Sequence, residues 1–274
     1  MKKVLVTGAS GYIGKHLCKL LLQNGYEVFG HDIVDDAYGD TQLSMLDIRN
    51  DKWTTTVTFD DVVHLAALVR VNESIERPYD YYNTNINGTV NVLNNTPCKN
   101  FIFASTGAAE NPISPYALSK RVTEDIVKEY CTKNQLPFTI FRFYNVIGTD
   151  GIPPTNPDGL FYNLLQSEQT GQFRIFGCDY NTPDGTPIRD YVHVMDICRS
   201  IMLAIEKPAN KLENLGTGIG HTVKEITQTF YRVNGINCNV EYLPRRNGDA
   251  EKTVLDNVSD YMINSYTLEE LVKK

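Results

Sequence analysis

Three glycines at three-residue spacing, between a strand pattern and a helix pattern, constrain the fold of this chain more than any other feature. Gly8, Gly11 and Gly14 lie in KVLVTGASGYIGKHL, directly after an apolar run and directly before an amphipathic segment. The first allows a tight strand-to-helix turn, the second lets the backbone approach a pyrophosphate, and the third lets the helix pack on the strand. The helix N-terminus adds N–H groups and partial positive charge. The sequence therefore predicts a dinucleotide-binding turn; the alternative is a glycine-rich turn without a ligand.

Short apolar runs alternate with helix-periodic segments through the first half of the chain, from KVLV and GKHLCKLLLQNG to NFIFAS and PYALSKRVTEDIVKEYC. Apolar strands that are each followed by a helix indicate a parallel sheet covered on both faces. We predict an α/β protein with a doubly wound Rossmann sheet over 1–145 and a smaller C-terminal substrate-binding lobe over 146–186 and 207–274. The strand-then-helix pattern RDYVHVMDICRSIMLAIEK predicts that about 187–206 rejoins the first sheet.

The composition of the chain excludes several classes of binding partner and cellular location. A net charge of -7 argues against a nucleic-acid or anionic-membrane surface, because such surfaces need an excess of Lys and Arg, so we expect a small-molecule partner. The run Val4-Leu5-Val6 is too short for a signal-peptide core, and no stretch reaches the roughly 18 apolar residues of a membrane span. The six cysteines are far apart and form no Cys-x-x-Cys, so no metal site and no disulfide framework are predicted and a reducing cytoplasm fits best.

An acidic residue at the end of the second strand predicts which dinucleotide binds. Asp32 lies 24 residues after Gly8, near the distance at which an acid meets the adenosine ribose in such folds. A carboxylate there accepts hydrogen bonds from both ribose hydroxyls and repels a 2′-phosphate, so we expect NAD rather than NADP; the alternative is a solvated aspartate. Asp47 and Ile48 follow the short apolar run LSML and are candidates to flank adenine, or else form a plain loop.

The stretch SPYALSK contains the candidate catalytic pair. Ser114 suits an N-cap and Pro115 suits the first helical position, so a helix is predicted to begin there. Tyr116 and Lys120 then lie one turn apart on the same face. A separate apolar stripe on this helix is predicted to face the core: Leu118, Val122 and Ile126.

Tyrosine ionises near pH 10, so a tyrosine that acts as a base near neutrality needs a pKa lowered by about three units. Lys120 and a positively charged nicotinamide are expected to supply that stabilisation jointly. Upstream, Ser105 and Thr106 end the strand pattern NFIFAST, where a hydroxyl would enter the same crevice and bridge substrate and tyrosine. Together with the glycine turn and the strand-end acid, these parts occur in the order of an extended short-chain dehydrogenase/reductase.

The resemblance is closest to the UDP-glucose 4-epimerase family and covers nearly the whole chain. It is carried by VTGASGYIGKHL, LAALVRVNESIERPYDYYNTNINGT, NFIFAST, SPYALSK, FRFYNVIG, IFGCDYNTPDGTPIRDYVHVMDI, NLGTGIGHTV and PRRNGD, in family order. The most specific of these is the segment from Ile175 to Ile197.

The resemblance implies an epimerase that interconverts UDP-glucose and UDP-galactose with bound NAD, and a homodimer formed through the helices near Tyr81–Asn95 and Pro115–Tyr130. It implies a catalytic set of Thr106, Tyr116 and Lys120. The cofactor-binding set that it implies, together with the pair Tyr116 and Lys120, is Gly8, Gly11, Tyr12, Ile13, Gly14, Asp32, Asp47, Ile48, Leu65, Ala66, Ala67, Asn85 and Tyr144. The substrate-binding set is Asn145, Asn163, Leu164, Arg189, Tyr191, Arg246, Asp249 and Thr253.

The chain also departs from the family pattern. Nine residues separate Thr106 from Tyr116, fewer than in the usual member, and the stretch from Asp32 to Asp47 is short as well. Val69-Arg70 stands where many members carry a lysine near the cofactor phosphates.

Three functions remain open. The first is the epimerase, with N-acetylhexosamine sugars as additional substrates. In the family the position of Thr253 borders the C2 substituent of the hexose, and a bulky aromatic there resembles a gate that excludes N-acetylated sugars, whereas threonine is smaller. The alternative is that Thr253 lies on a surface turn. The second is a nucleotide-sugar 4,6-dehydratase or decarboxylase, although Gly107-Ala108 replaces the Asp-Glu pair that dehydratases place after the threonine. The third, an NAD-bound protein without catalysis, is disfavoured by the intact Thr, Tyr and Lys.

Overall fold

The computed structural model describes residues 1–50, 53–246 and 248–274. The chain divides into two compact units, each built from two segments. Unit 1 contains Met1–Phe143 and Cys198–Asn214, and unit 2 contains Tyr144–Ile197 and Leu215–Lys274.

Unit 1 is built on a seven-stranded sheet with the order β10-β6-β5-β4-β1-β2-β3. From β3 to β6 the neighbouring strands pair in parallel, in the order of a doubly wound Rossmann sheet, which confirms the predicted fold class. The strands are β1 (Lys3–Thr7), β2 (Glu27–Asp32), β3 (Gln42–Met45), β4 (Asp61–His64), β5 (Phe101–Thr106), β6 (Phe138–Phe143) and β10 (Asn210–Leu215).

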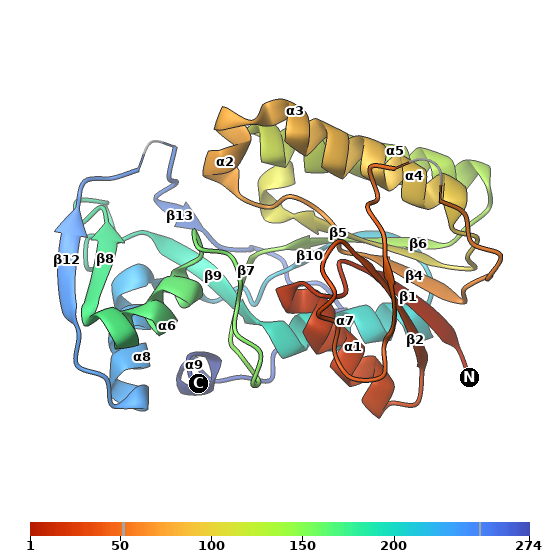
Figure 1. Ribbon diagram of the computed structural model, residues 1–274. Coiled ribbons are helices and arrows are strands. Elements are labelled where there is room, and N and C mark those ends of the chain that lie inside the picture. Colours follow the sequence, from red (N-terminus) through yellow and green to blue (C-terminus); the bar gives the residue numbers. More distant parts are fainter. Residues whose placement is uncertain (51–52, 247) are drawn as a thin grey trace. The chain divides into compact units, whose positions relative to one another are not determined.

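Helices cover both faces of this sheet, as Figure 1 shows, with α2 to α5 on one face and α1 and α7 on the other. They are α1 (Tyr12–Gln23), α2 (Val71–Glu76), α3 (Pro78–Tyr81), the π-helical η1 (Tyr82–Asn87), α4 (Gly88–Asn95), the 3-10 turn η2 (Gly107–Ala109), α5 (Pro115–Lys133) and α7 (Val194–Glu206), which passes from unit 2 into unit 1. Because both faces are covered, β1 and β4 are buried at nearly every position.

Unit 2 contains two small sheets. In the first, the strand β9 (Ile188–His193) pairs with three others: β7 (Asn145–Ile147), β11 (Gly220–Thr222) and β13 (Lys252–Thr253). In the second, β8 (Gln172–Phe176) pairs in parallel with β12 (Asn239–Leu243). The helices are α6 (Leu160–Thr170), α8 (Val223–Asn234) and α9 (Leu268–Leu271). Phe161 and Phe230 meet edge to face in the core of this unit, at a centroid distance of 5.7 Å.

The prediction that about 187–206 rejoins the first sheet is wrong for its strand, although the residues from Cys198 onward belong to unit 1. The strand there, β9, pairs within unit 2, and the chain instead returns to the seven-stranded sheet through β10. The physical reason is that an apolar pattern in the sequence indicates that a strand is buried but not which sheet it joins. The last four residues of β9 are buried, whereas β10 is an edge strand with two exposed residues at its start.

The predicted core stripe on α5 is also wrong at two positions. The helix begins at Pro115 and is capped by Ser114, whose Oγ accepts a hydrogen bond from the N–H of Ala117 at 3.2 Å, as predicted. However, Leu118 is 41% and Val122 is 37% exposed. The buried residues of α5 are instead mostly small or polar: Ala117, Ser119, Lys120, Thr123, Glu124, Val127 and Cys131.

Candidate functional site

The glycine turn has the backbone geometry that its sequence predicts. Gly8 has φ of +73°, in the region that favours glycine, and its N–H donates to the carbonyl of His31 at 2.8 Å. A Cβ on Gly14 would lie 2.0 Å from the carbonyl oxygen of Gly8, so only glycine lets α1 pack this closely on the turn. The N-cap residue of α1, Gly11, provides no side-chain cap, so the first N–H groups of the helix are left for water or a ligand.

Asp32 lies at the end of β2 and holds the loop that follows. Its Oδ1 accepts hydrogen bonds from the N–H groups of Ile33 and Val34, at 2.7 and 3.1 Å, and its Oδ2 accepts one from Ser10 at 2.9 Å. Each carboxylate oxygen has two lone pairs, so Oδ2 keeps one for a further donor. The structure therefore places the predicted ribose-binding acid directly beside the glycine turn.

Asp47 and Ile48 follow β3 and behave differently. The carboxylate of Asp47 accepts hydrogen bonds from Arg49 Nε at 2.9 and 3.0 Å, and this guanidinium lowers the pKa of Asp47 below its ordinary value. The side chain of Ile48 is buried in the core of unit 1, where a Cβ on Gly88 would lie 2.7 Å from its Cδ1. Contacts from Ile48 to a ligand would therefore run through its backbone.

The loop after β4 contains three predicted cofactor residues, Leu65, Ala66 and Ala67. The N–H of Leu65 donates to the carbonyl of Thr7 at 3.1 Å, which ties this loop to the end of β1. Asn85, on η1, holds the next residue: its Oδ1 accepts from the N–H of Leu68 at 2.8 Å and its Nδ2 donates to the carbonyl of Leu68 at 3.0 Å. Its second amide hydrogen bonds Ser119 Oγ at 2.9 Å, so Asn85 positions the loop.

His64, at the end of β4, is a site residue that the sequence analysis missed. Its Nδ1 lies 2.6 Å from Thr7 Oγ1 and its Nε2 lies 2.8 Å from Thr89 Oγ1. Thr89 donates to the carbonyl of Asn85 at 2.7 Å, so the imidazole joins the glycine turn to the Asn85 segment. Burial and the nearby Lys120 lower the pKa of His64 to about 3, and the ring is neutral at pH 7. A histidine inside an apolar strand pattern is the only sequence signal for this role.

Tyr116 and Thr106 lie together at the carboxyl end of β5. Thr106 ends β5 and hydrogen-bonds the Tyr116 side chain in the second position of α5. Burial raises the pKa of Tyr116 to about 12, and the hydrogen bond to Thr106 lowers it. Within the polypeptide, burial outweighs the hydrogen bond from Thr106 and favours the phenol, and the joint lowering of this pKa by Lys120 and a nicotinamide stays a prediction. The ring of Tyr81 packs against Tyr116 at a centroid distance of 6.3 Å.

Lys120 lies one turn beyond Tyr116 and is 3% exposed. Its Nζ donates to the carbonyl of Ala104 at 2.9 Å and lies 4.8 Å from the ring centroid of Phe103. Burial lowers the pKa of Lys120 to about 7, while the carboxylate of Glu124 raises it. The structure therefore brings the three predicted catalytic residues together and leaves the lysine close to its titration point at neutral pH.

Three more predicted cofactor residues occupy the ends of helices and strands. Tyr12 and Ile13 open α1, and burial raises the pKa of Tyr12 well above its ordinary value. The carbonyl of Ile13 lies 3.9 Å from the Sγ of Cys198. Tyr144 belongs to unit 2, where its N–H donates to the carbonyl of Leu215 at 3.1 Å.

In unit 2, strand pairing brings four predicted substrate residues onto one sheet. Asn145 on β7 is opposite Tyr191 on β9, and Thr253 on β13 is opposite Arg189. Burial raises the pKa of Tyr191 far above its ordinary value, so it remains a neutral phenol. Asn145 donates from Nδ2 to the carbonyl of Asp190 at 3.0 Å.

Asp190 organises this sheet and was not predicted. Its carboxylate is fully buried and accepts hydrogen bonds from the N–H and Oγ1 of Thr217, at 2.8 and 2.7 Å, and from the N–H of Gly218 at 2.9 Å. It also accepts one from the N–H of Leu255 at 3.3 Å. One carboxylate therefore joins three segments of unit 2, between its neighbours Arg189 and Tyr191.

The remaining predicted substrate residues lie on α6 and on the loop after β12. Asn163 donates from Nδ2 to two backbone carbonyls, and Leu164 is fully buried in the core of unit 2. The guanidinium of Arg246 stacks on the ring of Phe176 at 3.8 Å from its centroid. The N–H of Asp249 donates to the carbonyl of Arg246 at 3.3 Å.

Tyr180 is a second residue that the sequence analysis missed in unit 2. Arg245 stacks on its ring at 3.9 Å and pairs with Asp179 at 2.7 Å. Burial and the carboxylate of Asp249 raise the pKa of Tyr180, whereas Arg245 and Arg189 lower it, so these charged groups surround the phenol. The Tyr180 hydroxyl is buried and has no hydrogen-bond partner among the described residues. The sequence signal is its place in the family-like segment CDYNTPDGTPIRDY.

Over residues 1–50, 53–246 and 248–274, no group of three or more His, Cys, Asp or Glu side chains is arranged to hold a metal ion. In that same part of the chain, no helix has both the length and the apolar character needed to cross a membrane.

Comparisons with known proteins show what this chain is similar to. The model of the NAD dependent epimerase/dehydratase family matches residues 4–218. UDP-glucose 4-epimerase 2 of Arabidopsis thaliana is 33% identical over 91% of this chain and 86% of its own length. The UDP-glucose 4-epimerase of Brucella ovis, solved in complex with NAD, is 28% identical with a TM-score of 0.88 over 99% of this chain and 96% of that chain. The UDP-Glc/GlcNAc 4-epimerase of Campylobacter jejuni is 27% identical with a TM-score of 0.83 over 99% and 97%.

Proposed function

Because this chain belongs to the NAD dependent epimerase/dehydratase family, we propose that it interconverts UDP-glucose and UDP-galactose by transient oxidation at C4 of the hexose, with NAD as a bound cofactor. The observation that carries the proposal is the cluster of Tyr116, Thr106 and Lys120 at the carboxyl end of β5, in the same unit as the glycine turn. A phenol hydrogen-bonded to a hydroxyl, with an ammonium group one helical turn away, is suited to moving a proton to and from a sugar hydroxyl.

Unit 1 fits a dinucleotide. The uncapped start of α1 and the open lone pair of Asp32 together suit a pyrophosphate followed by a ribose. We assign NAD to unit 1 and the UDP-sugar to unit 2. In unit 2 the guanidinium groups of Arg189 and Arg246 suit the diphosphate, because their fork geometry matches phosphate oxygens.

In the reaction, Tyr116 removes the proton of the 4-hydroxyl and later returns it, and the Thr106 hydroxyl relays between the phenol and the sugar. NAD bound in unit 1 would supply a reversible hydride acceptor for C4. Lys120, when protonated, stabilises the Tyr116 phenolate by its charge, which offsets the burial that holds the pKa of Tyr116 at about 12. The sugar leaves with inverted configuration at C4 and no net redox change.

The dehydratase alternative predicts elimination of water across C5 and C6. A dehydratase needs acidic groups beside the threonine, but Thr106 is followed by the turn η2, where Thr106 Oγ1 accepts the N–H of Ala108 at 3.3 Å. The absence of an adjacent carboxylate at Gly107 and Ala108 favours epimerisation.

One assay separates the three readings of the site. The purified protein is incubated with UDP-galactose, and the nucleotide sugars are separated and identified by mass. UDP-glucose of unchanged mass supports epimerisation, a product lighter by one water indicates a dehydratase, and unchanged UDP-galactose indicates a protein without this catalysis. Tyr116→Phe is the negative control, and Tyr242→Phe, an exposed tyrosine on β12, is the matched control.

A second substrate pair, the UDP-N-acetylhexosamines, is supported by Thr253. This residue pairs in register with Arg189, and its side chain is exposed and small, so it leaves room for an acetamido group beside the sheet. The relative from Campylobacter jejuni is named for both UDP-Glc and UDP-GlcNAc.

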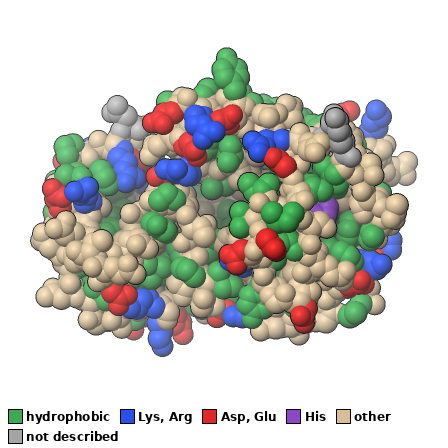
Figure 2. Space-filling model, viewed as in Figure 1, with side chains coloured by type: hydrophobic (Ala, Val, Ile, Leu, Met, Phe, Trp, Pro, Cys, Tyr) green, Lys and Arg blue, Asp and Glu red, His purple; other side chains and the backbone are tan. Residues whose placement is uncertain are grey.

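A homodimer is proposed from the exposed apolar side chains of unit 1. Hydrophobic side chains protrude at the top of Figure 2, over α3, where Tyr79 is 83% exposed. Ile75 on α2 and the α5 pair Leu118 and Val122 are also exposed. Exposed apolar residues that gather on neighbouring helices mark an interaction surface.

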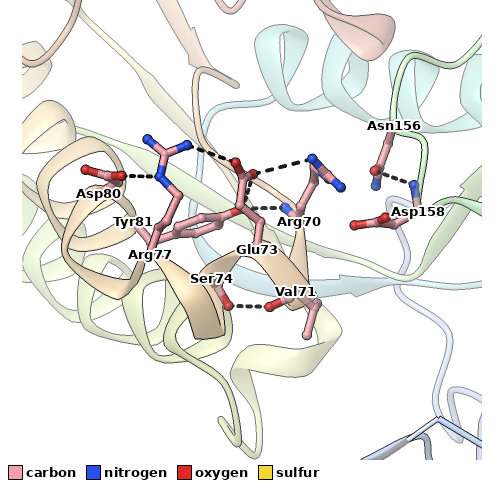
Figure 3. A network of polar contacts seen from close by, with 9 residues as sticks. All are labelled: Arg70, Val71, Glu73, Ser74, Arg77, Asp80, Tyr81, Asn156 and Asp158. Carbon is pink, nitrogen blue, oxygen red and sulfur yellow. Dashed lines mark hydrogen bonds and ion pairs between the residues drawn. The ribbon is translucent and has the colours of Figure 1, made fainter.

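The helices beneath this surface are held by a charged network around Glu73, drawn in Figure 3. Arg77 pairs with Glu73 at 3.2 Å and with Asp80 at 2.6 Å. The Tyr81 hydroxyl donates to Glu73 at 3.1 Å and accepts the N–H of Arg70 at 3.0 Å. Arg70, near the position where many family members carry a lysine, thus belongs to this network.

We also infer a reducing, cytoplasmic location from the six free cysteines.

A further inference from the structure

A buried ion pair lies behind the proposed catalytic lysine. Glu124 on α5 accepts hydrogen bonds at Oε1 from Arg142 Nε at 2.8 Å and at Oε2 from Arg142 Nη2 at 2.7 Å. The Ser105 hydroxyl donates to the same Oε1 at 2.6 Å. Glu124 is fully buried, Arg142 is 6% exposed and Ser105 is 4% exposed. The carboxylate is therefore held at a fixed place by three donors from β5 and β6.

The pair is built into the same piece of backbone as Lys120. Glu124 lies one turn beyond Lys120 on α5. Arg142 is opposite Ser105 in the pairing of β5 with β6, and the neighbour of Ser105, Ala104, supplies the carbonyl that accepts from Lys120 Nζ at 2.9 Å. A change in the pair therefore acts directly on the surroundings of the lysine.

Such a pair is a poor device for stability alone. Taking two charges out of water costs several kcal/mol per ion, and well-packed apolar residues in the place of a buried ion pair are often as stable or more so. The position of the pair, one turn from a lysine whose charge the reaction uses, suggests a different role.

The charged and titratable groups around Lys120 come from three elements. On α5 they are Tyr116 and Glu124, on β6 Arg142, and on β4 His64. His64 is neutral throughout the working range, since its pKa is lowered to about 3 and both ring nitrogens have hydroxyl partners. The fixed charges that Lys120 faces are therefore the negative charge of Glu124 and, behind it, the positive charge of Arg142.

We propose that the Glu124–Arg142 pair is a positioning device that sets the electrostatic balance at Lys120 and thereby the pH range in which Tyr116 can exchange a proton with the sugar. Glu124 favours the ammonium form of Lys120, and Arg142 limits that effect by neutralising Glu124. This inference rests on the proposed roles of Tyr116 and Lys120 in the epimerase reaction.

The two partners then have opposite effects on pH dependence. In its active form the Tyr116–Lys120 pair is a phenolate beside an ammonium group. On the acidic side of the pH profile the pair binds one more proton, on the phenolate. Glu124→Gln removes a negative charge near the pair, so the pair loses its first proton at a lower pH. The acidic limb of the kcat/KM profile therefore shifts to lower pH. Arg142→Gln exposes the charge of Glu124, so the acidic limb moves up. The shift is expected to reach about two pH units for Glu124→Gln, from the interaction of single charges about one helical turn apart at an effective dielectric constant near 20, and to be smaller for Arg142→Gln because Arg142 lies behind Glu124.

The test is a set of kcat/KM profiles from pH 5 to 10 for the full chain loaded with NAD. The variants are Glu124→Gln, Arg142→Gln, the double variant, and Arg142→Lys, which keeps the charge and loses the fork. We expect opposite shifts for the single variants and a profile within a few tenths of a pH unit of the original for the double variant and for Arg142→Lys. Glu129→Gln, an exposed acid on the same helix, is the matched control and should not shift the profile.

Loss of stability is measured in parallel from urea unfolding midpoints, because a purely structural pair would lower the midpoint without moving the profile in opposite directions. Shifts of the same sign, or no shift, in folded Glu124→Gln and Arg142→Gln overturn the inference. If Glu124→Gln fails to fold, Arg142→Gln against Arg142→Lys decides it, since only the first removes the charge. A failure of the proposed function is distinct: the unmodified protein would then show no epimerisation at any pH.

Discussion

The backbone N–H of Ser10, inside the glycine turn, donates to Oδ2 of Asp32 at 2.9 Å, so the residue proposed to hold the ribose also fastens the turn proposed to hold the pyrophosphate. The Ser10 hydroxyl continues the connection by donating to the carbonyl of Val34 at 2.6 Å. Charge at Asp32 and the conformation of the turn are therefore coupled.

From this coupling we predict two effects of Asp32→Ala. Removing the carboxylate narrows the preference for NAD over NADP, because the charge that repels a 2′-phosphate is lost, and it weakens NAD binding by about 10-fold or more through the lost hydrogen bonds. Binding of both nucleotides is measured by calorimetry. Asp35→Ala, an exposed acid three residues away, should change neither value. Tighter binding of NADP than NAD by the unmodified protein would contradict the role of Asp32.

We predict that Tyr116→Phe lowers kcat for UDP-galactose by about 10² to 10⁴, the range for loss of a positioned acid or base. The affinity for NAD and the urea midpoint should stay close to those of the original protein, because the ring and its contact with Tyr81 are kept. Unchanged turnover in this variant would remove Tyr116 from the mechanism.

The sequence predicts the parts of unit 1 whose chemistry is local. The glycine turn, the Ser114 cap and the spacing of Tyr116 and Lys120 follow from residues near one another in the chain, and the structure has the turn and the cap as predicted. The sheet to which β9 belongs depends on pairing between distant segments, which a local pattern does not specify.

Buried polar residues are the second feature that the sequence pattern does not predict. Periodicity assigns Leu118 and Val122 to the core, but the sheet-facing side of α5 carries Lys120 and Glu124, whose partners on β5 and β6 come from elsewhere in the chain. Asp190 is hidden for the same reason: its four donors come from residues 217, 218 and 255.

A prediction on pH concerns Lys120→Met. The phenolate of Tyr116 loses its cation, so its pKa rises and the pH optimum of any remaining activity moves upward. The stability effect has its own sign. The folded-state pKa of Lys120 is about 7, below its ordinary 10.5, so between these values the unfolded chain binds the additional proton and stability increases with pH.

Lys120→Met removes that dependence. Urea midpoints of the original protein, measured from pH 7 to 10, should therefore rise relative to those of the variant, and at pH 7 the variant should be at least as stable. The comparison is made between the two proteins because other groups contribute equally to both. Parallel midpoints across this range would contradict the buried, shifted lysine, and an unchanged activity optimum would contradict its role beside Tyr116.

The proposed dimer predicts a concentration-dependent mass. Light scattering at micromolar concentration should give twice the mass of the 30.9 kDa chain. Val122→Glu places a charge in the exposed apolar surface of α5 and should shift the protein toward monomer by 10-fold or more in dissociation constant, since an unpaired charge in an interface is costly. Asp125→Lys, an exposed change on the same helix, is the control for charge alone. A monomer at all concentrations in the unmodified protein would exclude this surface as a dimer interface.

The last prediction concerns Thr253, which is exposed on β13 and pairs in register with Arg189. If this position limits the group at C2 of the sugar, Thr253→Tyr narrows the site and lowers kcat/KM for UDP-N-acetylgalactosamine relative to UDP-galactose by about 10 to 200-fold, the range for a steric change in a pocket. Thr253→Ser keeps the site open and is the matched control. Both substrates are assayed in the three proteins at the same NAD loading. Because β13 has only two residues, the urea midpoint is measured as well, so that a general loss of structure is separated from selectivity. An equal ratio of the two kcat/KM values in the original protein and in Thr253→Tyr would place Thr253 on a surface turn without contact to the sugar.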